Sequence, residues 1–336
     1  LEGLGIQGFG VATVEEGVEL RQAGVRAPVL VMGAAYGKDH EEVIAQDLTP
    51  MVGVAEDVER FALAARRRRI LRMPVHLKVD TGMSRLGVTT ERFEDFLRAC
   101  AEHPTVRVDG MATHFACADL PDPAPTEAQL AAFIGCLDRA RAMGADPQQI
   151  HAANSAAALR FPRARFDLVR PGLVLYGALP SAHMDDPGLE PCMTLRTRIN
   201  ALRRVPAGTS VSYGGTWVAP RPSVIATLPV GYADGYHRSL SNRARVLARG
   251  HKVRQVGTIC MDLCMVDVTD LPGVAVGDEV VLMGRQGEAV ITPEDLARWA
   301  GTIPYEILCG ITRRVPRVYD ELEPAAHATM AEGEPR

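Results

Sequence analysis

Short β-branched runs and longer amphipathic runs alternate from residue 8 to about residue 180, and this alternation constrains the fold more than any other feature. We expect the short runs to be strands and the runs between them to be helices, because the apolar residues of the longer runs recur at helical spacing. Strands are expected at residues 8–13, 28–33, 48–53, 74–80, 106–115, 149–155 and 167–177. Repeated units of this kind favour parallel strands joined by right-handed crossovers.

The seven strands expected from this pattern are one short of a closed (β/α)8 barrel. We therefore expect an α/β fold, a (β/α)8 TIM-type barrel lacking its first βα unit. The chain begins at Leu1 rather than at a methionine. We expect the absent unit to lie upstream, so that the chain is an N-terminally truncated fragment.

After about residue 185 the pattern changes to strand-like runs separated by turns, with only one short helix expected, at residues 293–301. Such runs without long helices between them predict a mainly antiparallel β domain. The sequence is thus divided into a truncated barrel at 1–184, a C-terminal β domain at 185–325 and a flexible tail at 326–336.

Composition excludes several classes of function. Hydrophobic residues make up 47% of the chain and the net charge is −4, so a large core is expected and a basic nucleic-acid surface is not. No apolar run approaches the ~20 residues of a membrane span. The seven cysteines show neither a disulfide framework nor zinc-ligand spacing, which predicts a reduced, cytoplasmic protein without a structural metal.

Polar residues collect where the expected strands end. In a parallel barrel these ends and the loops after them form the active-site face. The residues concerned are Lys78, Asp80, Arg85, Thr113, His114, Asn154, Ser155, Arg170, Pro171 and Gly172. Each has a structural reading by itself, as a turn cap, a satisfied core histidine or a helix cap. Their common position predicts a site.

Two of these segments could hold an anion. Asn154 and Ser155 precede an alanine-rich helix start, and backbone N–H groups at such a start bind phosphate. The loop around Gly172 offers further exposed amides. No GxGxxG in a strand–helix setting and no GKS or GKT motif occurs, so neither a Rossmann dinucleotide site nor a P-loop is supported.

Eight motifs in order resemble one family. They are KVDTGMSRLG, THFACAD, ANSAA, VRPGLVLYG, VSYGG, GYADG, GTICMD and PYEILC, and the resemblance covers about residues 8–320. Together they are similar to the bacterial alanine racemases, enzymes with a barrel, a C-terminal β domain and pyridoxal 5'-phosphate (PLP). The resemblance implies interconversion of L- and D-alanine by two bases, a homodimer with shared active sites, and D-alanine supply for the cell wall.

The resemblance also assigns roles to residues. Tyr213 resembles the catalytic base for the L-alanine face. Arg85, Met261 and Tyr232 resemble residues at the substrate, of which Arg85 and Met261 contact its carboxylate and Tyr232 belongs to the entrance. Residues resembling cofactor contacts are Tyr305, Ser155, Asn154 and Gly172 near the phosphate, Arg170 at the pyridine nitrogen and His114 beside it.

Lys78 and Asp80 are two residues apart, so they lie on one face of their strand. Arg85 follows closely, and two neighbouring cations need an anion between them. Asp80 is one candidate. In the family the lysine matching Lys78 is often carbamylated, which turns a cation into an anion that can bind the arginine. An ordinary ion pair between Lys78 and Asp80 is the alternative.

One residue of the family pattern has no counterpart. The family's cofactor lysine, which is also its second base, stands at the end of the first barrel strand. None of the three lysines, Lys38, Lys78 and Lys252, has matching surroundings. We therefore expect this chain by itself to be inactive. A broad-specificity or serine racemase, and a non-enzymatic PLP-binding barrel protein, remain alternative functions.

Overall fold

The computed structural model describes residues 1–319, which form two compact units. The first, the barrel unit, is Leu1–Cys192, and the second, the β unit, begins at Met193. The boundary expected from the sequence was residues 184/185. The expected tail at 326–336 lies outside the described residues.

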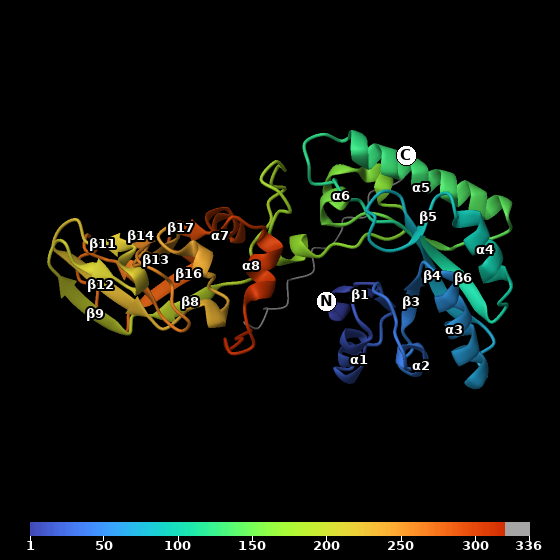
Figure 1. The fold of residues 1–336 in the computed structure, drawn as a ribbon, viewed down its shortest axis with the longest axis horizontal. Helices are drawn as coiled ribbons and strands as arrows, with labels where there is room; N and C mark the ends of the chain where they lie inside the picture. The colour runs from blue at the N-terminus through green and yellow to red at the C-terminus, as the bar shows by residue number, and fades with distance from the viewer. Residues whose placement is uncertain (320–336) are drawn as a thin grey trace, which may run out of the picture. The chain divides into compact units, whose positions relative to one another are not determined.

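The barrel unit is a curled parallel sheet with helices packed along it (Figure 1). Its strands are β1 (Phe9–Val11), β2 (Val29–Val31), β3 (Thr49–Val52), β4 (Met73–Asp80), β5 (Val88–Thr89), β6 (Val106–Ala112) and β7 (Gln149–His151). Its helices are α1 (Val14–Gln22), α2 (Asp39–Ala45), α3 (Ala55–Arg67), α4 (Phe93–Ala101), α5 (Ala124–Ala142) and α6 (Ser155–Arg160). The sheet order β1-β2-β3-β4-β6-β7, with β5 beside β4, confirms the expected parallel α/β class.

Six of the seven expected strands are present, and the last is wrong. Residues 167–177 contain a single bridge between Leu168 and His151, followed by the 3-10 helix Leu173–Tyr176. Pro171 has no N–H to donate to a strand ladder. The Arg170 amide instead donates to the Ala153 carbonyl (2.9 Å), which keeps this segment beside the end of β7.

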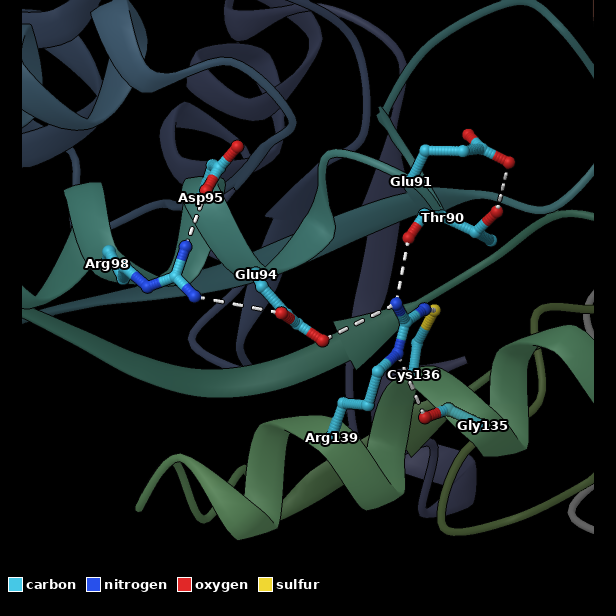
Figure 2. Close-up of polar contacts among 8 residues, drawn as sticks. All are labelled: Thr90, Glu91, Glu94, Asp95, Arg98, Gly135, Cys136 and Arg139. Carbon is cyan, nitrogen blue, oxygen red and sulfur yellow. Dashed lines mark hydrogen bonds and ion pairs between the residues drawn. The ribbon is translucent and has the colours of Figure 1, made fainter.

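Exposed polar side chains connect helices α4 and α5 (Figure 2). Arg139 of α5 donates to the carbonyl oxygen of Thr90 (3.0 Å) and lies 3.8 Å from a carboxylate oxygen of Glu94, which also pairs with Arg98 (3.7 Å). Such exposed pairs stabilise by at most ~1 kcal/mol each. Burial of Phe93, Leu130 and Phe133 in the core of the unit contributes more.

The β unit confirms the expected antiparallel domain. Its elements are β8 (Leu195–Arg198), β9 (Ala201–Val205), β10 (Ser210–Val211), β11 (Trp217–Val218), β12 (Ser223–Leu228), β13 (Arg245–Ala248), β14 (His251–Gln255), β15 (Cys264–Asp267), β16 (Glu279–Gln286), β17 (Ala289–Ile291), α7 (Pro293–Ala300) and α8 (Pro304–Gly310). The main sheet runs β17-β16-β13-β14-β15-β12-β9, and β10 and β11 form a separate ribbon. The expected helix at 293–301 is α7, which begins with a capping box between Thr292 and Asp295. The helix α8 was not expected.

Within residues 1–319, every helix is too short or too polar to cross a lipid bilayer.

Candidate active site

The loop after β4 is organised by Asp80. One carboxylate oxygen of Asp80 accepts hydrogen bonds from the amides of Gly82, Met83 and Ser84, at 2.9, 2.9 and 3.0 Å. The loop that these bonds close presents Arg85 to solvent. Among the ion pairs of the described residues, none joins Asp80 to Lys78 or to Arg85. Asp80 is therefore a turn-forming residue, not the anion expected between two cations.

Lys78 lies half-buried on β4 and lines a narrow cleft together with Arg85 and His114. Burial and then the charges of Arg85 and Arg170 lower the pKa of Lys78, while Asp80 acts in the opposite direction. The surroundings of Lys78 thus shift its amine towards the neutral form.

Arg170 is held by groups from two segments, the residues at the ends of β6 and β7. Its guanidinium donates to the carbonyl oxygens of Thr113 (2.7 Å) and Ala152 (2.9 Å) and to Nδ1 of His151 (2.6 Å), and it lies 3.4 Å from Nδ1 of His114. Burial lowers the pKa of Arg170 to about 10, so the group stays protonated at neutral pH. The ends of β6 and β7 therefore fix one cation in a defined orientation.

The hydrogen bonds behind Arg170 determine where the histidine protons are. An arginine donates and never accepts, so Nδ1 of His151 is unprotonated and its Nε2 carries the proton. That Nε2 lies 2.8 Å from Nδ1 of His76, which therefore accepts. Hydrogen bonds are thus donated by Arg170 to His151 and by His151 to His76. The two imidazoles are 0% and 4% exposed respectively.

All three histidines around Arg170 are neutral at physiological pH. Burial, with the Arg170 charge, lowers the pKa of His151 to about 2 and that of His114 to about 4. Burial lowers the pKa of His76 to about 4 as well, although the Asp109 carboxylate opposes this. The region around Arg170 thus holds one fixed positive charge and no readily available proton.

The segments expected to bind phosphate lie side by side. Asn154 caps α6 by accepting from the Ala157 amide (3.0 Å), and the buried Ser155 hydroxyl oxygen accepts from the Gly172 amide (2.9 Å). The Ser155 hydroxyl proton remains available to another acceptor, and the space beside Gly172 is open to 4 Å. The first N–H groups of a helix have no carbonyl partner within it, so α6 adds further donors.

Gln129 on α5 connects two loops of the site and was missed in the sequence. Its side chain accepts from the Ala116 amide (2.9 Å) and donates to the His114 carbonyl (3.2 Å) and to the Thr81 hydroxyl (3.3 Å). The Thr81 hydroxyl also lies 2.7 Å from that of Thr113. One buried amide therefore sets the spacing between the loop of Arg85 and the loop of His114.

His76 and His151 were also missed, although the sequence carried a signal. His76 alternates with Lys78 and Asp80 on β4, and His151 ends β7 just before Asn154. Polar residues inside strands that are otherwise apolar point to a shared buried network. Gly110 on β6 makes room for it, since a Cβ there would lie 2.5 Å from Nδ1 of His76.

The β unit carries the remaining expected site residues. Tyr213 is 73% exposed in the turn between β10 and β11, and Tyr232, Met261 and Tyr305 are also exposed. The Tyr232 amide donates to the carbonyl oxygen of Cys260 (3.1 Å), so the GYADG and GTICMD motifs are in contact. Tyr232 and Met261 thus share one surface of the β unit.

The GYADG and GTICMD motifs are further joined by an arginine. Arg314 pairs with Asp234 of the first motif (2.9 Å) and with Asp262 of the second (2.7 Å).

Comparison with known proteins agrees with this geometry. The family model described as alanine racemase, N-terminal domain, matches residues 1–180, and the C-terminal domain model matches residues 192–319. The chain is 48% identical to an alanine racemase of Sorangium cellulosum over 96% of this chain and 86% of that one. It is 44% identical to an alanine racemase of Geobacter sulfurreducens, over 95% and 85% of the two chains.

A solved structure with the same architecture is alanine racemase from D-cycloserine-producing Streptomyces lavendulae. It has a TM-score of 0.89 and 39% identity, and the match covers 93% of this chain and 83% of that one. Since both family models match and relatives are this similar over most of their length, the chain belongs to the alanine racemase family.

Proposed function

We propose that this is a racemase that interconverts L- and D-alanine with PLP when a Schiff-base lysine, which these residues by themselves do not supply, completes the site, and that Tyr213 removes and returns the α-proton on the L-alanine face. Alanine racemisation follows from membership in the family. The cofactor, the roles of single residues and the shared sites are the proposal. The observation that carries it is the fixed, protonated Arg170 surrounded by neutral histidines beside the donors of Ser155 and Gly172.

Apart from the Schiff-base lysine, which has no counterpart among these residues, the side chains and amides of the site fit PLP. The phosphate would be held by the Ser155 hydroxyl, by the amides near Gly172 and Asn154, and by Tyr305. Among the hydrogen bonds of the described residues, none uses the Nε–H of Arg170, which is therefore a donor for a pyridine nitrogen. Bound PLP supplies an electron sink for the α-carbon of an amino acid.

Arg170 has a chemical consequence beyond binding. Because Arg170 keeps its own proton and His76, His114 and His151 are neutral imidazoles without an acidic proton, a ring nitrogen at this place remains an acceptor. Electron withdrawal from the α-carbon is then weaker than with a protonated ring. Side reactions such as transamination are disfavoured.

Arg85 and the Met261 backbone would hold the substrate carboxylate, and Tyr232 would line its entrance. Lys78 would support Arg85 as a carbamate. Carbon dioxide adds to the neutral form of an amine, and burial and the neighbouring charges, which lower the pKa of Lys78, shift it towards that form. The product is an anion between the charges of Arg85 and Arg170. Asp80 does not fill this position, because its carboxylate closes the loop.

The exposure of Tyr213 supports a homodimer with shared active sites. A base in proton transfer needs a position within hydrogen-bond reach of its substrate and protection from bulk water. A side chain that is 73% exposed has neither within its own unit. A symmetric dimer would complete both sites with the same contact. The free cysteines support a reducing cytoplasmic location.

Mixed dimers test this function. In protein expressed from the complete gene, Tyr213→Phe and Arg170→Ala should each abolish racemisation of L-alanine, while Tyr319→Phe, another exposed tyrosine, should not. A mixed dimer of the two inactive subunits should regain about half of the native activity, because one of its sites carries both defects and the other neither. No recovery in verified mixed dimers would refute site sharing. Native activity in Tyr213→Phe would refute the assigned base.

A further inference from the structure

The backbone just before Tyr213 is in an unusual conformation. Ser212 has φ 68° and ψ −176°, a region that is populated almost only by glycine. The next residues, Gly214 and Gly215, also have positive φ, at 73° and 56°. The Tyr213 ring is 73% exposed, so packing within its own unit does little to hold it. The backbone at Ser212 therefore determines the direction of the Tyr213 side chain.

Hydrogen bonds to Thr258 hold this conformation. The Ser212 hydroxyl donates to the carbonyl oxygen of Thr258 (2.5 Å), and the Thr258 hydroxyl donates to the carbonyl oxygen of Tyr213 (2.9 Å). The first bond holds the Ser212 side chain, and the second holds the peptide group that follows the tyrosine. Gly257 permits the close approach, since a Cβ there would lie 2.8 Å from the Ser212 Cβ.

A second layer of bonds supports Thr258. Its hydroxyl lies 3.2 Å from that of Thr216, which accepts from the Asn242 side-chain amide (3.0 Å). The side-chain oxygen Oδ1 of Asn242 accepts from the Gly257 amide (2.6 Å). The turn that carries Tyr213 is therefore bonded to two other segments of the β unit.

We propose that Ser212 is the positioning residue for Tyr213, and that its hydroxyl bond to Thr258 keeps the backbone in a glycine-type conformation that aims the phenol. The inference rests on the function proposed for Tyr213. A turn needed only to connect β10 and β11 would be served by glycine at this position, as at 214 and 215. The side chain of serine adds the one feature that glycine lacks, a hydroxyl that restricts the turn to one direction.

The substitution Ser212→Gly distinguishes an effect on the orientation of Tyr213 from an effect on the stability of the fold. Glycine adopts this conformation without strain, so the thermal midpoint should be unchanged or higher, but nothing then restricts the turn. Turnover should fall about 10²-fold with little change in KM, because a displaced reacting group costs rate more than affinity. Thr258→Val leaves the backbone carbonyl that accepts from Ser212 in place but removes the hydroxyl bond to the Tyr213 carbonyl, so turnover should fall here as well. Thr258→Ser, which keeps the hydroxyl, should have native values. Arg249→Gly, which places glycine at another residue with positive φ (51°), is the matched control and should be silent.

Two measurements distinguish a loss of Tyr213 orientation from a general loss of structure. In protein labelled with 3-fluorotyrosine, the fluorine resonance that disappears in Tyr213→Phe should become narrower in Ser212→Gly, as the ring gains mobility, while the other tyrosine resonances stay in place. The primary isotope effect with α-deuterated L-alanine should rise more than that with α-deuterated D-alanine, because Tyr213 acts on the L face.

The outcomes separate this inference from the function on which it rests. If Tyr213→Phe is inactive but Ser212→Gly has native turnover and an unchanged fluorine resonance, Ser212 does not position the base. If Tyr213→Phe keeps native activity, the role of Tyr213 itself fails. If Ser212→Gly lowers the thermal midpoint and turnover together and leaves both isotope effects equal, its role is structural and the inference is refuted.

Discussion

Replacing Gly110 by alanine should disrupt the histidine pair behind Arg170. A Cβ at this position would lie 2.5, 2.6 and 2.7 Å from Nδ1, Cε1 and Cγ of the His76 ring. Gly110 is not among the glycines with positive φ, so alanine is compatible with the backbone and only the contact with the ring opposes it. The ring must move, and its 2.8 Å bond to His151 must break.

The cost follows from these contacts. Forcing a methyl group into a packed interior costs about 1–3 kcal/mol. Leaving a buried donor, here Nε2–H of His151, without its acceptor costs about 1–3 kcal/mol more. Gly110→Ala should therefore destabilise the barrel unit by roughly 2–6 kcal/mol. In a His76→Ala background the ring that obstructs the methyl group is gone, and the same change should cost less than about 1 kcal/mol. The coupling energy between the two positions is then about 1–6 kcal/mol.

The chain contains probes that distinguish its two units. Cys136 is 0% exposed in the core of the barrel unit, so its rate of thiol labelling reports opening of that unit. The only two tryptophans, Trp217 and Trp299, belong to the β unit, and their fluorescence during urea unfolding serves as the internal control. Labelling of Cys136 should accelerate in Gly110→Ala, and the tryptophan midpoint should stay constant. An equal cost with and without His76 would refute the argument.

Three further predictions concern the same site. Since the pKa values of His76, His114 and His151 lie at about 4, 4 and 2 instead of 6.5, the unfolded chain takes up protons first as pH falls. Urea midpoints from circular dichroism of the barrel helices should therefore be highest above about pH 6.5 and fall towards pH 4, and a flat profile would contradict neutral histidines. Labelled bicarbonate should give a carbamate carbon signal that disappears in Lys78→Arg; its persistence would exclude Lys78. Gln129→Leu should destabilise the barrel unit by about 1–3 kcal/mol in the Cys136 labelling assay, because the Ala116 amide loses its acceptor. A labelling rate equal to that of the native protein would show that the Gln129 hydrogen bonds do not stabilise the unit.

Local pattern accounts for what the sequence predicted well. The period of the apolar residues changes from helical to alternating near residue 185, and both units have the expected class. Strand 74–80 is predicted almost to the residue as β4, because eight consecutive residues carry the signal. The strand expected at 167–177 fails, since a β-branched run that contains Pro171 resembles a strand in composition but cannot complete a ladder. The helix α8 was not predicted, because it is only seven residues long and most of it is the motif PYEILC.

The sequence by itself determined the class of both units, the order of the motifs and the family, because these depend on residues near one another in the chain. Tertiary structure alone decided what the polar residues do. Asp80 closes its own loop instead of pairing with Lys78, and His76 reaches Arg170 through His151. These partners are brought together only when β4, β6 and β7 align in the sheet. Burial there, which no local pattern encodes, is what keeps the histidines neutral.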